Sequence, residues 1–133
     1  MPRFLTASLV LLLTAAAPVW AAWDPQAFSK ESTLEFLTVG PQEGEHWSTV
    51  WLVVIDGQVY IRLGSRAADR MTQNTTKPIV KLRIAGQEFD RVNAEPAPDM
   101  VEPVAKAMGD KYTTDVLIRY FNHPLTMRLT PAP

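Results

Sequence analysis

Alternation of apolar and polar residues over short stretches of this chain predicts a mainly β protein. Trp47–Ile55 is almost continuously apolar and rich in β-branched and aromatic residues, which predicts a buried strand. Asp56-Gly57 follows, and both residues adopt the positive φ angles of a two-residue hairpin turn at little cost. The return strand is Gln58–Leu63, in which side chains alternate between two faces. One face carries Val59, Ile61 and Leu63, and the other carries Tyr60 and Arg62.

A second alternating pair lies in the middle of the chain. Pro78–Ile84 alternates well, Ala85-Gly86 predicts a turn, and Gln87–Ala94 predicts the returning strand. Glu95–Pro98 contains two prolines and should end that strand. Leu125–Leu129 again has an apolar residue at every second position, which predicts a closing strand.

Other segments have helical spacing. Ser29–Thr38 places two leucines three residues apart, which favours a short amphipathic helix. Asp99, with a glutamate three residues later, fits a capping pattern for a helix that Gly109 would end. Thr114–Phe121 suits either a short helix or a strand. Five or six strands with two or three short helices predict a mainly β fold with some α, a small antiparallel barrel.

The first 21 residues have the pattern of a secretory signal peptide. Arg3 precedes an apolar run, Phe4–Ala17, and the small residues Val19 and Ala21 stand at the −3 and −1 positions of a cleavage site. The run is shorter than the ~20 residues of a bilayer span, so cleavage is favoured over a retained membrane anchor. We therefore expect residues 1–21 to be removed, and residues 22–133 to form one domain in the periplasm or outside the cell.

Composition excludes several function classes. Without Arg3, the mature part has 12 cations and 14 acids, and this net charge of −2 argues against a nucleic-acid binder. The absence of cysteine excludes disulfides, thiol nucleophiles and cysteine metal sites. His46 follows Glu43 and Glu45, but a solvated acidic loop is favoured over a metal site there, and we predict no metal.

Charge is unevenly distributed along the mature chain. Residues 58–83 carry six cations and one acid, a net +5, with Gly64 and Ser65 at a turn that a polar loop follows. Such a segment suits a small anionic ligand, phosphorylated or carboxylated, because it combines charge with directed donors. Residues 24–56 carry a net −5. Two alternatives therefore stay open, namely a solvated basic loop and a basic segment neutralised by the acidic one, within the chain or across a dimer.

Several short motifs resemble the flavin-binding split barrels, that is, the pyridoxamine-phosphate-oxidase-like proteins and their deazaflavin-dependent relatives. The motifs are YIRLGSR, the polar loop, the Pro78–Ile84 strand and the ending KY…MRLTP, and the resemblance covers roughly residues 46–131. It implies a split β-barrel, a homodimer with two flavins in grooves between the subunits, and FMN or a related flavin as cofactor. Some relatives bind haem, for which His123 would be an axial ligand, although a plain helix-end histidine is favoured.

The resemblance also implies a set of cofactor-binding residues. The matching positions at the phosphate turn are Tyr60, Arg62, Gly64, Ser65 and Arg66, and Lys77 lies near an Asn-Pro-like step. Ala67 stands where relatives usually have a lysine, so Arg70 would supply that cation. Tyr60 or Trp47 would flank the ring, although core packing is favoured for Trp47.

Two functions stay open on these grounds. The first is a secreted split-barrel protein that binds FMN as an oxidoreductase or a cofactor carrier, in which the flavin supplies the chemistry. The second is a non-catalytic periplasmic module that keeps the barrel and uses its basic groove for another anion or a partner protein. The sequence does not decide whether the protein is an enzyme.

Overall fold

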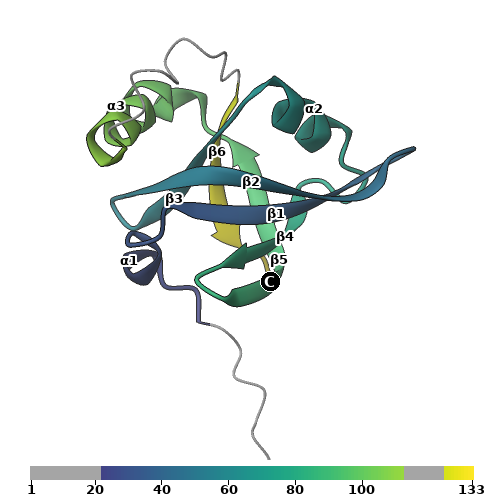
Figure 1. Ribbon diagram of the computed structural model, residues 1–133, viewed down its shortest axis with the longest axis horizontal. Coiled ribbons are helices and arrows are strands. Elements are labelled where there is room, and N and C mark those ends of the chain that lie inside the picture. The colour runs from purple at the N-terminus through teal and green to yellow at the C-terminus, as the bar shows by residue number, and fades with distance from the viewer. Residues whose placement is uncertain (1–21, 113–124) are drawn as a thin grey trace, which may run out of the picture.

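The computed structural model describes residues 22–112 and 125–133, so the predicted signal peptide, the Thr114–Phe121 segment and His123 lie outside the described part. The elements in chain order are α1 (Pro25–Phe28), β1 (Thr33–Gly40), β2 (Gly44–Ile55), β3 (Gln58–Leu63), α2 (Ser65–Gln73), β4 (Ile79–Ile84), β5 (Gln87–Pro96), the 3₁₀ turn η1 (Pro98–Met100), α3 (Val101–Lys111) and β6 (Leu125–Pro131). The six strands close into an antiparallel barrel in the order β1-β2-β3-β6-β5-β4 (Figure 1). This confirms the predicted small antiparallel barrel.

The two predicted hairpin turns are present. Asp56 and Gly57 join β2 to β3 with φ angles of 50° and 73°, and Ala85 and Gly86 join β4 to β5 with φ angles of 53° and 71°. Positive φ at both central positions gives a turn whose twist matches that of the flanking strands. The register follows from these turns, since Ile55 pairs with Gln58 beside the first of them.

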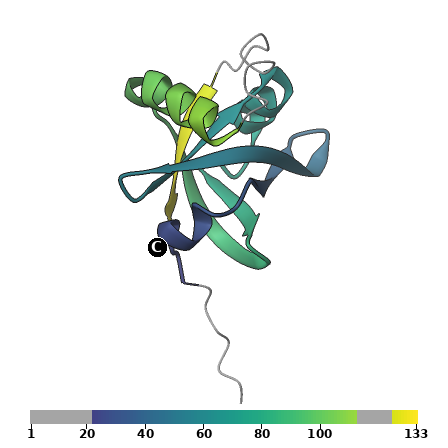
Figure 2. The same ribbon diagram turned by 60° about the vertical axis from the view of Figure 1, so that its left-hand side comes forward.

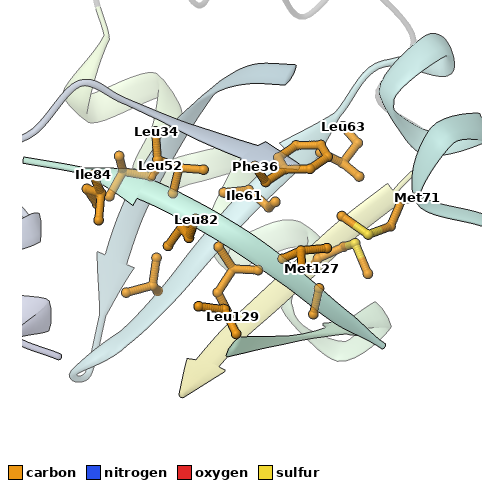
Figure 3. Close-up of a cluster of buried hydrophobic side chains, with 14 of the residues drawn as sticks. Leu34, Phe36, Leu52, Ile61, Leu63, Met71, Leu82, Ile84, Met127 and Leu129 are labelled. Atoms are coloured by element: carbon orange, nitrogen blue, oxygen red, sulfur yellow. The ribbon is translucent and has the colours of Figure 1, made fainter. Parts of the chain in front are cut away.

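Buried side chains from all six strands fill the barrel interior. Figure 3 shows part of this cluster, with labelled residues from β1, β2, β3, β4 and β6. The largest fully buried ones on the strands are Leu34, Phe36, Leu52, Val59, Ile61, Leu63, Val80, Leu82, Val92 and Leu129. Ala68 and Met71 of α2 join this cluster, so the helix covers one end of the barrel. Val59, Ile61 and Leu63 therefore share one face of β3, as predicted, and that face lines the barrel interior.

A second apolar cluster lies outside the barrel, between α3 and the outer face of β2 and β3. It joins Val53 and Tyr60 on the strands to Val104 and Met108 on the helix. In both Figure 1 and Figure 2, α2 and α3 lie on the same side of the barrel, and α1 lies on the opposite side. The outer surface of β3 is thus covered where Tyr60 lies.

The predicted helix over Ser29–Thr38 is wrong, because residues 33–38 of this segment belong to the strand β1. Leu34 and Phe36 point into the barrel with Glu35 between them on the outer face, and β1 pairs with both β2 and β4. A spacing of three between two leucines fits a strand as well when one of them, Leu37, packs on the outer face. Pairing with neighbours on both sides then outweighs the weak local preference.

The polar loop predicted after Ser65 is also wrong, since residues 65–73 form α2. Only Ala68 and Met71 are buried on this helix, so its apolar stripe is too narrow to stand out among polar residues. The helix α3 begins after η1 without a side-chain cap, so Asp99 does not cap it. Gly109 does not end α3 either, because the helix continues to Lys111.

Candidate functional site

The N-terminus of α2 gathers three of the predicted site residues. Gly64 is the N-cap residue in an extended conformation, with φ −70° and ψ 174°, and no side chain caps the helix. Ser65 and Arg66 occupy the exposed first turn. The free N–H groups of a first helical turn carry partial positive charge and favour an anion. Within the part of the chain that the structure describes, Arg66 makes no hydrogen bond or ion pair.

Arg70 lies one turn further along α2 and is already engaged. Its Nε atom donates to both carboxylate oxygens of Glu43 at 3.1 and 3.2 Å, and its Nη2 atom donates to Oε1 at 3.0 Å. The hydrogen bond from Arg70 lowers the pKa of the Glu43 carboxyl. Glu43 belongs to the acidic segment, in the turn between β1 and β2. The acidic part of the chain therefore folds against the basic part at this point.

Two more cations of the basic segment pair with acids on the outer face of β4 and β5. Arg83 Nε lies 3.3 Å from Glu88, and Lys81 Nζ lies 3.6 Å from Glu88 and 3.9 Å from Asp90. The Arg83 guanidinium also lies 3.8 Å from the centroid of the Trp47 ring. Trp47 is half-buried on the outer face of β2, outside both apolar clusters. The role of Trp47 as a platform for a cofactor ring stays a prediction. Arg83 already lies over the Trp47 ring.

Tyr60 and Arg62 share the outer face of β3, as predicted from the alternation. Tyr60 is only 3% exposed beneath α3, and its hydroxyl accepts hydrogen bonds from Nε and Nη2 of Arg128, both at 3.2 Å. Arg62 is half-buried and engaged by other groups. The Tyr60 ring therefore presents no open face for stacking in this conformation.

Lys77 lies beyond the other end of α2. Its Nζ atom donates to the carbonyl oxygen of Thr72 at 3.1 Å, in the last turn of the helix, where a cation is favourable. The structure thus brings Gly64, Ser65 and Arg66 together and places Lys77, Tyr60 and Trp47 elsewhere. Thr72, which Lys77 contacts, lies six positions after Arg66, and this spacing corresponds to about 9 Å along a helix.

Some residues that organise this region carry no sequence signal of their own. Asn74 is 1% exposed, accepts a hydrogen bond from Val39 N at 2.9 Å and donates one to Ile79 O at 3.1 Å. It thereby ties the end of α2 to β1 and β4. The sequence near Asn74 indicates only a polar turn, because the strands that carry Val39 and Ile79 come together with it only in the folded barrel.

The described residues hold no group of three histidine, aspartate or glutamate side chains that suits a metal ion. His46 Nδ1 lies 3.6 Å from Glu43 Oε1, in the same turn region that Arg70 contacts. Across residues 22–112 and 125–133, no helix has the length and apolar character needed to cross a bilayer.

Neither a family model nor a curated protein matches this chain, whereas solved structures do. The heme storage protein HutZ from Vibrio cholerae superposes with a TM-score of 0.62 at 18% identity, over 80% of this chain and 87% of that one. An F420-H2 dependent reductase, FDR-A, gives 0.56 at 12% identity over 75% and 95%. A structure described as a domain-swapped dimer gives 0.56 at 11% identity over 75% and 81%. The chain therefore has the split β-barrel fold of these proteins, as its sequence motifs predict.

Proposed function

We propose that this protein is an exported split-barrel protein that binds a planar cofactor carrying a phosphate, with FMN as the first candidate. The phosphate would lie at the N-terminus of α2, against the first-turn N–H groups, the Ser65 hydroxyl and the Arg66 guanidinium. The observation that carries this proposal is that the helix begins uncapped behind Gly64, beside an arginine that pairs with no acid of the described residues. Amides, a hydroxyl and a guanidinium are the donors that phosphate oxygens accept.

The donor set fits the phosphate end of such a cofactor better than its ring end. Tyr60 is covered by α3, and Arg83 lies over Trp47, so neither ring is bare. Arg70 would reach a phosphate only after leaving Glu43. We therefore assign the anion chiefly to Ser65 and Arg66, and the ring to a groove completed by a second subunit, as the family resemblance implies.

Two structural neighbours support a cofactor as the ligand. HutZ is described as a heme storage protein and FDR-A as a reductase that depends on F420-H2. A bound flavin would supply hydride chemistry, and this chain's residues would hold and orient it. We therefore include oxidoreductase activity in the proposal. A homodimer is proposed with it, and one neighbour is described as a domain-swapped dimer.

A second candidate is a module that keeps the barrel without flavin. Three observations favour it, namely the Glu43–Arg70 pair, the covered Tyr60 ring and Ala67 in place of the family's lysine. In both cases we propose export to the periplasm or the exterior, because residues 1–21 have the pattern of a signal peptide.

The test uses residues 22–133 purified after export. Visible absorption is recorded first, and FMN and riboflavin are then titrated by calorimetry. FMN should bind more tightly than riboflavin, which lacks the phosphate, and Arg66→Ala should weaken FMN by about 10- to 150-fold, the value of a charged hydrogen bond. Arg91→Ala removes an exposed arginine of β5 and should leave FMN affinity unchanged.

A colourless protein that binds neither compound would overturn the flavin proposal and favour the module. Equal affinity for FMN and riboflavin would overturn the phosphate assignment, as would unchanged FMN affinity in Arg66→Ala. Sedimentation of the same samples tests the proposed dimer.

A further inference from the structure

An apolar pocket of about 360 Å³ opens between α2 and the adjoining ends of β4, β5 and β6. Its lining residues are Met71, Thr72, Lys77, Pro78, Ala94, Pro96, Leu125 and Met127. Six of these eight are apolar, and Figure 3 shows the Met71 side chain pointing from α2 toward Met127 on β6. A cavity of this size and character is within the range of small-molecule sites. Methionine side chains adapt readily to the shape of an apolar guest.

Two side chains of the lining are polar, and one of them, Lys77, is positively charged. The Thr72 hydroxyl donates to Ala68 O at 2.9 Å, so it is satisfied within the helix. Among the described residues of the lining, Lys77 is the one ionised side chain, and its Nζ atom donates to a neutral carbonyl, Thr72 O. Within residues 22–112 and 125–133, no carboxylate pairs with Lys77, whereas Lys81 and Arg83 both have acidic partners.

We propose that this pocket binds a small amphiphilic acid, an apolar body carrying one carboxylate. The apolar part would lie against Met71, Met127 and Leu125, and the carboxylate would accept from the Lys77 ammonium at the rim. Burial of the apolar body supplies affinity, and the uncompensated ammonium selects a negative end group over a neutral or positive one.

This site is separate from the proposed cofactor site and goes beyond it. The pocket uses the second half of α2, about 9 Å along the helix from Ser65. Neither Ser65 nor Arg66 lines it. Lys77, which the family resemblance places near the cofactor, is assigned here to the amphiphilic acid instead.

The probe is decanoate, with decanol and decyltrimethylammonium as neutral and cationic matches, all below their aggregation limits. Residues 22–133 are labelled with carbon-13 at the methionine methyl groups. Decanoate should shift the Met71 and Met127 signals in a saturable manner, whereas Met100 and Met108 lie in the α3 region and should stay unchanged. Decanoate should bind about tenfold more tightly than decanol, as a charge-assisted hydrogen bond implies.

Two variants test the assignment to residues. Lys77→Met keeps an apolar stem and removes the charge, so decanoate should lose about tenfold in affinity while decanol does not. Thr72→Trp places a large ring at an exposed position of the lining and should weaken both probes. Lys106→Met changes an exposed lysine of α3 outside the lining and should alter neither.

Three results would overturn the proposal: no saturable shift at Met71 and Met127, equal affinity for all three probes, or unchanged decanoate affinity in Lys77→Met. FMN titration of the same variants separates the two sites. If decanoate fails while Arg66→Ala still weakens FMN, only the pocket assignment fails. If FMN fails while decanoate binds as described, the pocket stands alone.

Discussion

Asn74 offers the sharpest test of how the barrel holds α2 in place. The residue is 1% exposed directly after the helix, and its Oδ1 atom accepts from Val39 N at 2.9 Å and from Thr76 N at 3.3 Å. Its Nδ2 atom donates to Ile79 O at 3.1 Å. One amide thus joins the end of α2 to two strands that are neighbours in the barrel.

The substitution Asn74→Ala should destabilise the protein by about 2–4 kcal/mol. Val39 N–H would be left without its acceptor in a partly buried position, which costs about 1–3 kcal/mol, and the smaller side chain adds a packing loss of about 1 kcal/mol. Ile79 O adds little, because Thr76 Oγ1 also donates to it at 2.7 Å. The measurement is urea unfolding of residues 22–133. The dependence of the unfolding free energy on urea concentration should be the same in both proteins, so that the shift in midpoint reports the change in stability.

Asn93→Ala is the matched control. Asn93 bonds to Glu95 on an exposed part of β5, so its loss should change stability by no more than about 0.5 kcal/mol. If Asn74→Ala shifted the midpoint no more than this control does, the buried amide would not be what anchors α2, and the reasoning would fail.

Two further predictions concern α3 and the outer face of the sheet. Lys111 Nζ donates to Glu31 O and Leu52 O, and burial lowers its pKa below 10.5. At this group the unfolded chain binds more protons between that lowered pKa and 10.5, so the contribution of Lys111 to stability should rise with pH in this window. The difference in urea midpoint between the wild-type protein and Lys111→Met should therefore change in favour of the wild type as the pH rises. Trp47→Ala should cost about 1–2 kcal/mol in the same assay, below the 3–5 kcal/mol of a buried tryptophan, because Trp47 is half-buried and contacts Arg83. A loss equal to that of a core residue would place Trp47 in the core.

The parts of the fold that could be predicted are those set by local chemistry. Each of the turns at Asp56-Gly57 and Ala85-Gly86 is marked by a glycine, which accepts positive φ, and the strands beside them alternate clearly. The strand β1 could not be distinguished from a helix, because its pairing partners β2 and β4 come later in the chain. The closure of the barrel by β6 against β3 and β5 is likewise non-local.

The candidate site was less accessible to prediction, because its partners are distant in sequence. The cation cluster of residues 58–83 is evident from composition, but the fold distributes it over β3, α2, the turn that follows α2, and β4. Arg70 meets Glu43 across 27 positions, and Arg128 meets Tyr60 across 68. Neither pairing produces a pattern in the sequence. The number of cations could therefore be read from the sequence, but not which of them are already paired with another side chain.

The helical conformation of residues 65–73 changes what the cluster can do. In a loop, Arg66 and Arg70 would spread apart, whereas on α2 they are four residues apart and share one face, where two like charges repel. Glu43 reduces this repulsion by neutralising Arg70, and it thereby leaves Arg66 as the cation beside the uncapped helix start. The Glu43–Arg70 ion pair thus leaves one arginine, Arg66, for the proposed anion site. An anion that needed two would have to displace a carboxylate already bound through both of its oxygens.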